Sequence, residues 1–154
     1  QWMFFKSALD AGLADFAYRI ADTALTLWQN ECAESYCCFE HFMIESRRGA
    51  GWHQFSGLSS PIVQWFSAYY RPGTLTTGFD AFVRHTDWAP DNSALDATLD
   101  FTEAGRSTVL AVLQPGPKAV TASVPCTVTT RHDGLLELTF ALDAPCTVTI
   151  SIHS

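Results

Sequence analysis

The sequence lacks both an excess of positive charge and a long hydrophobic run. Nine Lys and Arg residues stand against 16 Asp and Glu residues, so the formal net charge is −7. This balance argues against binding to nucleic acid or to an anionic membrane surface. No apolar segment approaches the roughly 20 residues of a membrane span, and the N-terminus has no signal-peptide pattern. We therefore expect neither nucleic acid nor a membrane among the partners.

An initiator methionine is also missing, and cysteine is sparse. The chain opens on Gln1 followed directly by an apolar stretch, from which we expect a piece of a longer protein. Five cysteines in 154 residues are too few for a small disulfide scaffold and leave at least one unpaired within the chain. Cys126 and Cys146 each open an identical CTVT stretch. We expect these two strands to flank one central strand, about 9–10 Å apart, which is too far for a disulfide. The compartment stays open.

Charged residues are few as well, at 16 %, against 47 % hydrophobic residues, which is typical of a globular chain. Residues 3–28 carry apolar side chains at three- and four-residue steps, which predicts a helix with a break at Gly12. Ser60 and Pro61 are typical of a helix start, and apolar residues continue this second helix to Arg71. Because the second helix is apolar over most of its circumference, we expect it to be buried on several sides.

After about residue 91 the helical period gives way to the alternating Thr, Val and Leu pattern of strands. The predicted strands are 95–101, 108–113, 119–124, 127–131, 135–142 and 147–152. Six short strands at this spacing predict a small antiparallel β-sandwich. We therefore expect an α+β chain with a helical part at 1–88 and a β-sandwich at 89–154. The helical part is too small to form a whole domain alone.

The chemistry of the chain is concentrated in residues 39–61. Glu40 lies between two aromatic residues and beside His41, and a turn with two arginines leads on to Trp52, His53 and Gln54. Aromatic rings stack on the C–H faces of a sugar, while carboxylate, imidazole and amide groups bind its hydroxyls. This composition suits a neutral, polyhydroxylated ligand. A single carboxylate cannot, however, supply both the acid and the base of a hydrolysis.

The same segment resembles a loop near the C-terminal end of the inverting (α/α)6-barrel glycoside hydrolases, the clan of glucosidase I, trehalase and mannosylglycerate hydrolase. The clan's loop has the form E-x-[YF]-[DN]-P-[ED]-T-G-x-G and is followed by F-S/G-W/L-[ST]. Residues 40–49 and 51–59 match it in order, whereas Met43, Ile44 and Ser46 replace its Asp, Pro and Thr. The resemblance implies that residues 1–88 are the last helical hairpins of such a barrel.

What the resemblance implies about activity is the hydrolysis of a glycosidic bond with inversion. Inversion needs an acid and a base whose carboxyl groups stand roughly 6.5–9.5 Å apart. The clan's base is the glutamate of this loop, which corresponds to Glu40, and its acid lies on an earlier helix outside these residues. The chain alone is then an inactive part of a glycosidase, without metal or cofactor. Its partners are an oligosaccharide or glycoside and the remainder of the barrel, and its expected substrate contacts are Trp52, Phe55, His41, His53 and Gln54.

Several residues have other interpretations. Trp52 and Phe55 also suit ordinary core packing, and His53 and Gln54 also suit hydrogen bonds to the loop backbone. The two arginines of the turn either pair with Glu45 or are solvated. Asp80 and Asp87 are conceivable second acids, but both follow the last predicted helix, which favours a linker. Four potential metal ligands follow the spacing C-x4-C-C-x2-H, namely Cys32, Cys37, Cys38 and His41. This spacing does not suit a structural zinc site, because the side chains of adjacent cysteines point apart.

The alternative function is a non-catalytic β-sandwich module that binds carbohydrate or protein and is carried on a helical stalk. In that case the chemistry lies in residues 89–154, where the sequence has no motif that we could assign.

Overall fold

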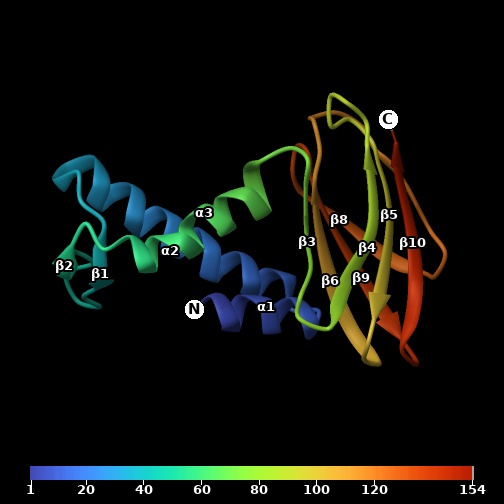
Figure 1. Cartoon of the computed structure of the whole chain (residues 1–154), viewed down its shortest axis with the longest axis horizontal. Helices are drawn as coiled ribbons and strands as arrows, with labels where there is room; N and C mark the ends of the chain where they lie inside the picture. The colour runs from blue at the N-terminus through green and yellow to red at the C-terminus, as the bar shows by residue number, and fades with distance from the viewer. Residues whose placement is uncertain (154) are drawn as a thin grey trace.

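The computed structural model describes residues 1–153, and of residues 56–59 it describes the backbone only. Three helices form one layer beside an eight-stranded sandwich, and a separate two-stranded hairpin lies at the end of the helical layer away from the sandwich (Figure 1). The helices are α1 (Trp2–Asp10), α2 (Ala14–Ser35) and α3 (Ser56–Tyr70). The hairpin consists of β1 (Phe39–Phe42) and β2 (Gly49–His53).

The break between α1 and α2 follows from one glycine. Gly12 has φ +67°, a left-handed conformation that side chains disfavour. It also approaches the sandwich closely, because a Cβ at this position would lie 2.7 Å from the Cβ of Arg106. The predicted break at Gly12 is therefore confirmed. Helix α2 continues further than predicted and ends at Tyr36, whose φ of 56° reverses the chain.

The sandwich consists of two antiparallel four-stranded sheets. The inner sheet, which faces the helices, has the order β3-β6-β9-β8, and the outer sheet has the order β4-β5-β10-β7. Successive strands often change sheet, since only β4 with β5 and β8 with β9 form hairpins within one sheet. The strands are β3 (Thr74–Thr76), β4 (Ala81–Trp88), β5 (Leu95–Phe101), β6 (Gly105–Val112), β7 (Ala119–Ala122), β8 (Cys126–His132), β9 (Leu135–Leu142) and β10 (Cys146–His153).

All six predicted strands are present, and β5 and β9 have the predicted bounds. The expected arrangement of the CTVT strands was wrong. Strand β8, with Cys126, is at the edge of the inner sheet, whereas β10, with Cys146, is in the middle of the outer sheet. Both cysteines are free. Local sequence determines that a segment is a strand, but its neighbours are chosen by distant residues.

Two hydrophobic cores lie on the two sides of the inner sheet. The first fills the sandwich and includes Leu99, Leu138 and Phe140. The second lies between the inner sheet and the helices, where Phe5 of α1 and Tyr69 of α3 are completely buried. The inner sheet contributes three side chains to this second core, which are Leu110, Val112 and Leu135. Because β6 lies between the two cores, its residues 107–112 are all buried.

The expected fold class was wrong, because the helical part does not form the end of an (α/α)6 barrel. The described residues form three helices and ten strands in three antiparallel sheets. Helices of such a barrel pack on other helices, but α1 and α3 pack on β6 of the inner sheet. The sheet buries only one side of α3: Trp65 and Tyr69 are enclosed, while Val63 and Phe66 are exposed. The expectation that α3 is buried on several sides was therefore wrong, although apolar residues surround most of the helix.

Strands β3 and β4 also belong to the sandwich, so that the helical layer ends at Tyr70. Among the described residues, no helix is both long and apolar enough to cross a membrane.

Candidate functional site

The residues singled out in the sequence lie on the hairpin β1–β2 and just after it. The hairpin is antiparallel and pairs Phe39 with His53 and His41 with Ala50. The register shifts between Phe39 and His41, where the single residue Glu40 lies opposite two residues of β2, Gly51 and Trp52, so that β2 carries a β-bulge facing Glu40. Bulges bend a strand and redirect a side chain, and they are common next to active sites. Residues 39–53 have no sustained strand period, and this hairpin was not predicted.

A buried ion pair fixes the hairpin to helix α2. Glu31 in the last turns of α2 has a side chain that is 3 % exposed. It accepts hydrogen bonds from Nε and a terminal nitrogen of Arg48, at 2.8 and 3.1 Å, and from the backbone N–H of Gly49 at 2.8 Å. These donors lower the pKa of the Glu31 carboxyl to about 2. Arg48 also reaches the exposed Glu34 at 2.7 Å. Arg48 thus has the acidic partners expected of one of the two arginines, but they lie on α2.

Glu40 and His41 meet over Gly51. A Cβ at Gly51 would lie 2.7 Å from Oε2 of Glu40 and 3.0 Å from Cε1 of His41. The backbone of Gly51, with φ +80°, is left-handed. Only glycine leaves room for both side chains against this strand. The carboxylate and the imidazole are therefore adjacent, and both residues are exposed to solvent.

A second pair is formed by the rings of Trp52 and Phe55. Their centroids are 6.3 Å apart and their planes meet at 66°, an edge-to-face contact. The indole of Trp52 is nevertheless 73 % exposed, so that it is not a core residue. His53 and Gln54 are exposed as well, and Gln54 adopts φ 60° in the turn into α3. The predicted site residues thus form two side-chain pairs on one exposed hairpin and its following turn.

The other candidates of the sequence lie elsewhere or lack the chemistry. Among the residues described, no group of three or more potential ligands is arranged to hold a metal ion, and this includes the cluster around Cys37 and Cys38. Asp80 precedes β4, next to Asp10 of α1, and burial followed by this neighbouring charge raises the pKa of its carboxyl. Asp87 is in β4 and opposes Asp96 of β5. Both acids belong to the sandwich side of the molecule.

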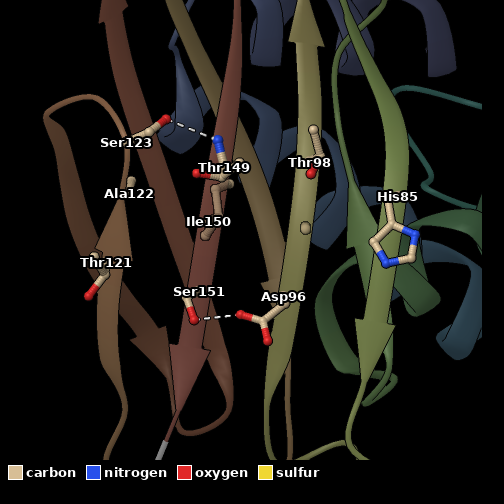
Figure 2. A pocket seen from close by; sticks show the side chains of 10 residues that line it. His85, Asp96, Thr98, Thr121, Ala122, Ser123, Thr149, Ile150 and Ser151 are labelled. Carbon is tan, nitrogen blue, oxygen red and sulfur yellow. Dashed lines mark hydrogen bonds between the residues drawn. The ribbon is translucent and has the colours of Figure 1, made fainter.

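Sequence reasoning missed a shallow pocket on the open face of the outer sheet. Its volume is about 400 Å³, and half of its ten lining residues bear hydroxyl groups, beside one acid, one imidazole and three apolar residues (Figure 2). Ser151 donates a hydrogen bond to Asp96, and Ser123 accepts one from the backbone of Thr149 at 3.0 Å. The signal for it was the alternation of Thr and Ser with apolar residues in β7 and β10. Its polar lining consists of His85, Asp96, Thr98, Thr121, Ser123, Thr149 and Ser151.

Comparison with known proteins gives no relative: no family model, no curated protein and no solved structure matches this chain.

Proposed function

We propose that the hairpin contributes the general base of a glycoside hydrolase and that Glu40 is this base. The observation that carries the proposal is the placement of Glu40 opposite the β-bulge of β2, beside His41 and on the same hairpin as the exposed Trp52. An exposed indole provides a flat apolar surface for a sugar ring. Carboxylate and imidazole groups next to each other provide the hydrogen bonds that orient its hydroxyls.

In the proposed reaction, Glu40 removes a proton from a water molecule as that water attacks the anomeric carbon. An acid on the opposite side of the sugar protonates the leaving oxygen, about 6.5–9.5 Å from Glu40. We place this acid on a polypeptide that faces the hairpin. His41, His53 and Gln54 bind hydroxyl groups, and Trp52 together with Phe55 stacks on the ring. By itself, the chain described here is expected to bind a glycoside without hydrolysing it.

The test is Glu40→Gln in the protein at its full natural length, assayed on a panel of glycosides. General-base catalysis contributes about 10²–10⁴-fold, and we expect a loss of kcat of this size without a comparable change in KM. Glu45→Gln is the matched control, since Glu45 is exposed on the turn of the same hairpin. NMR of the first product should show inversion of the anomeric configuration. Near wild-type turnover in Glu40→Gln would disprove the assignment.

The second candidate is carbohydrate binding by the outer sheet, which the hydroxyl-lined pocket favours. The two CTVT stretches provide a matched pair of variants for this test, because Thr149 lines the pocket whereas Thr129 lies on the inner sheet. If the pocket binds saccharides, Thr149→Val weakens binding in titration calorimetry and Thr129→Val leaves it unchanged. Equal affinities of both variants would exclude this pocket as the site.

A further inference from the structure

Three thiols meet where helix α2 passes into the hairpin. Cys32 is in the last turn of α2, and Cys37 and Cys38 precede β1. The left-handed Tyr36, whose N–H donates to the carbonyl of Cys32 at 3.0 Å, turns the chain back on itself between them. This reversal places Cys37 and Cys38 next to the C-terminal end of α2. All three residues are partly accessible.

Within this cluster, the thiol of Cys32 lies against the peptide bond that joins Cys37 to Cys38. The Cys32 thiol donates to the carbonyl oxygen of Cys37 at 3.2 Å. Burial, followed by charge and hydrogen-bond interactions with the Cys38 thiol, raises the pKa of Cys32. Cys37 and Cys38 are adjacent in sequence, and side chains of adjacent extended residues point to opposite sides. Cys38 is therefore the partner that faces Cys32.

We infer that Cys32 and Cys38 are a dithiol pair that reacts with a small-molecule disulfide to form an intramolecular disulfide. The Cys38 thiolate attacks the disulfide R–S–S–R, giving the mixed disulfide Cys38–S–S–R and one thiolate R–S⁻. The Cys32 thiolate then attacks the Cys38 sulfur and releases the second R–S⁻. The two cysteines lose two protons and two electrons, and the oxidant becomes two thiols. The raised pKa of Cys32 leaves only a small fraction of this thiol as thiolate. In the second step, the proximity of Cys32 to the Cys38 sulfur compensates for that small fraction.

The bond would connect the end of α2 with the hairpin at a second point. The carbonyl of Cys38 accepts the N–H of Phe55 at 2.9 Å, so this residue already connects the entrance and the exit of the hairpin. The Glu31–Arg48 pair holds the turn end. A disulfide restricts the opened state of the segment that it closes. Oxidation is thus expected to slow local opening of the hairpin, independently of whether Glu40 is catalytic.

The experiment equilibrates the wild-type chain with oxidised glutathione and maps its peptides by mass spectrometry. The expected product is a peptide linked from Cys32 to Cys38 and lighter by two hydrogen atoms. Cys37→Ser is the matched control and retains the linkage, whereas Cys32→Ser, which lacks the thiol of the second step, accumulates the glutathione adduct on Cys38. Amide hydrogen exchange of 39–42 should slow on oxidation of the wild type and not of Cys38→Ser.

Three results of the wild-type map would each overturn the inference, and none of them depends on the stability of a variant. These results are a bond between Cys37 and Cys38, glutathione adducts without an internal bond, and three free thiols after equilibration.

Discussion

At the scale of single residues, the feature that most affects the candidate site is the charged side chain of Glu31, which is shielded from solvent. Glu31 is almost completely buried, yet it is compensated by a bidentate arginine and a backbone amide. An ion pair of this kind is costly to break, because removing one partner leaves the other buried and uncompensated. Glu31 and Arg48 are therefore positioning residues for the hairpin that carries Glu40.

The lowered pKa of Glu31 makes this contribution dependent on pH. A carboxyl whose pKa is about 2 when folded and 4.5 ordinarily stabilises the fold fully above pH 4.5, and it loses this effect as the pH falls toward 2. We expect Glu31→Gln to reduce the unfolding free energy above pH 4.5 and the difference from wild type to shrink below it. Urea unfolding at a series of pH values measures this. Glu34→Gln is the control: it removes an exposed partner of the same arginine and should change little. A difference for Glu31→Gln that grows on acidification would contradict the assignment.

Gly51 is expected to tolerate no side chain. Gly51→Ala forces a Cβ against Glu40 and His41 and onto a left-handed backbone, for a loss of about 1 kcal/mol or more. Gly116→Ala is the matched control, since it also has positive φ but has nothing within 4 Å of its Cβ. Both variants lose stability in urea unfolding, but only Gly51→Ala should shift the Cε1–H resonance of His41. An unchanged resonance in Gly51→Ala would show that the two side chains do not meet over this glycine.

At this scale the sequence singled out candidate site residues, which stay a prediction, but it did not reveal what holds them in place. Glu40, His41 and Trp52 were found from their chemistry and order along the chain. The partnership of Glu31 with Arg48 was missed, because the two residues are 17 positions apart and are separated by the end of α2 and the first part of the hairpin. Only the reversal at Tyr36 brings the two together. No local pattern distinguishes such a glutamate from a solvated one.

At the scale of elements, prediction succeeded where the side chains alternate and failed where they do not. Strand β5 alternates buried and less buried residues along its full length, and its bounds were predicted. Strand β4 has one buried residue and a bulge between Val83 and His85, and β3 has three residues. Neither has a sustained period of two. The pieces of the hairpin are equally short, and β2 contains two glycines.

The attachment of helix α1 to the inner sheet is expected to depend on its buried face. Phe5→Ala removes a ring that is completely buried between helices and sheet, which costs about 3–5 kcal/mol in unfolding free energy. Phe4→Ala is the matched control, because the neighbouring ring is 70 % exposed, and it should cost less than about 0.5 kcal/mol. Chemical denaturation of both variants measures the difference. Equal losses would mean that α1 does not pack on the sheet in this orientation.

At the scale of the whole molecule, the inner sheet joins the two parts that the sequence had separated. Leu110 and Val112 of β6 face the helices, while Val109 and Ala111 face the outer sheet. Arg131 of β8 adds an ion pair with Asp15 of α2 and another with the buried Glu137. A barrel segment with an appended sandwich would have shared no such strand. The correct arrangement depends on contacts between distant segments, which periodicity does not encode.

We therefore expect the helical layer and the sandwich to unfold in one transition. Helix content in far-ultraviolet circular dichroism and the fluorescence of Trp88, in the sandwich, should have the same denaturation midpoint once the other tryptophans are replaced by phenylalanine. A chain that begins at Arg71 should aggregate, because it exposes Leu110, Val112 and Leu135. Separate midpoints, or a soluble and folded 71–154 chain, would contradict the shared core.

The two CTVT stretches create a competition between strand pairings during folding. The tetrapeptide that forms part of an edge strand in β8 could equally begin the central strand β10, and its first four residues do not distinguish the two. The residues that follow the tetrapeptide do distinguish the two strands. His132 at the position of Ile152 would place an imidazole where the native side chain is completely buried, and it would lose its 2.7 Å bond to the carbonyl of Tyr69. The residues that follow the shared tetrapeptide, and not the tetrapeptide itself, therefore distinguish the edge strand from the central strand.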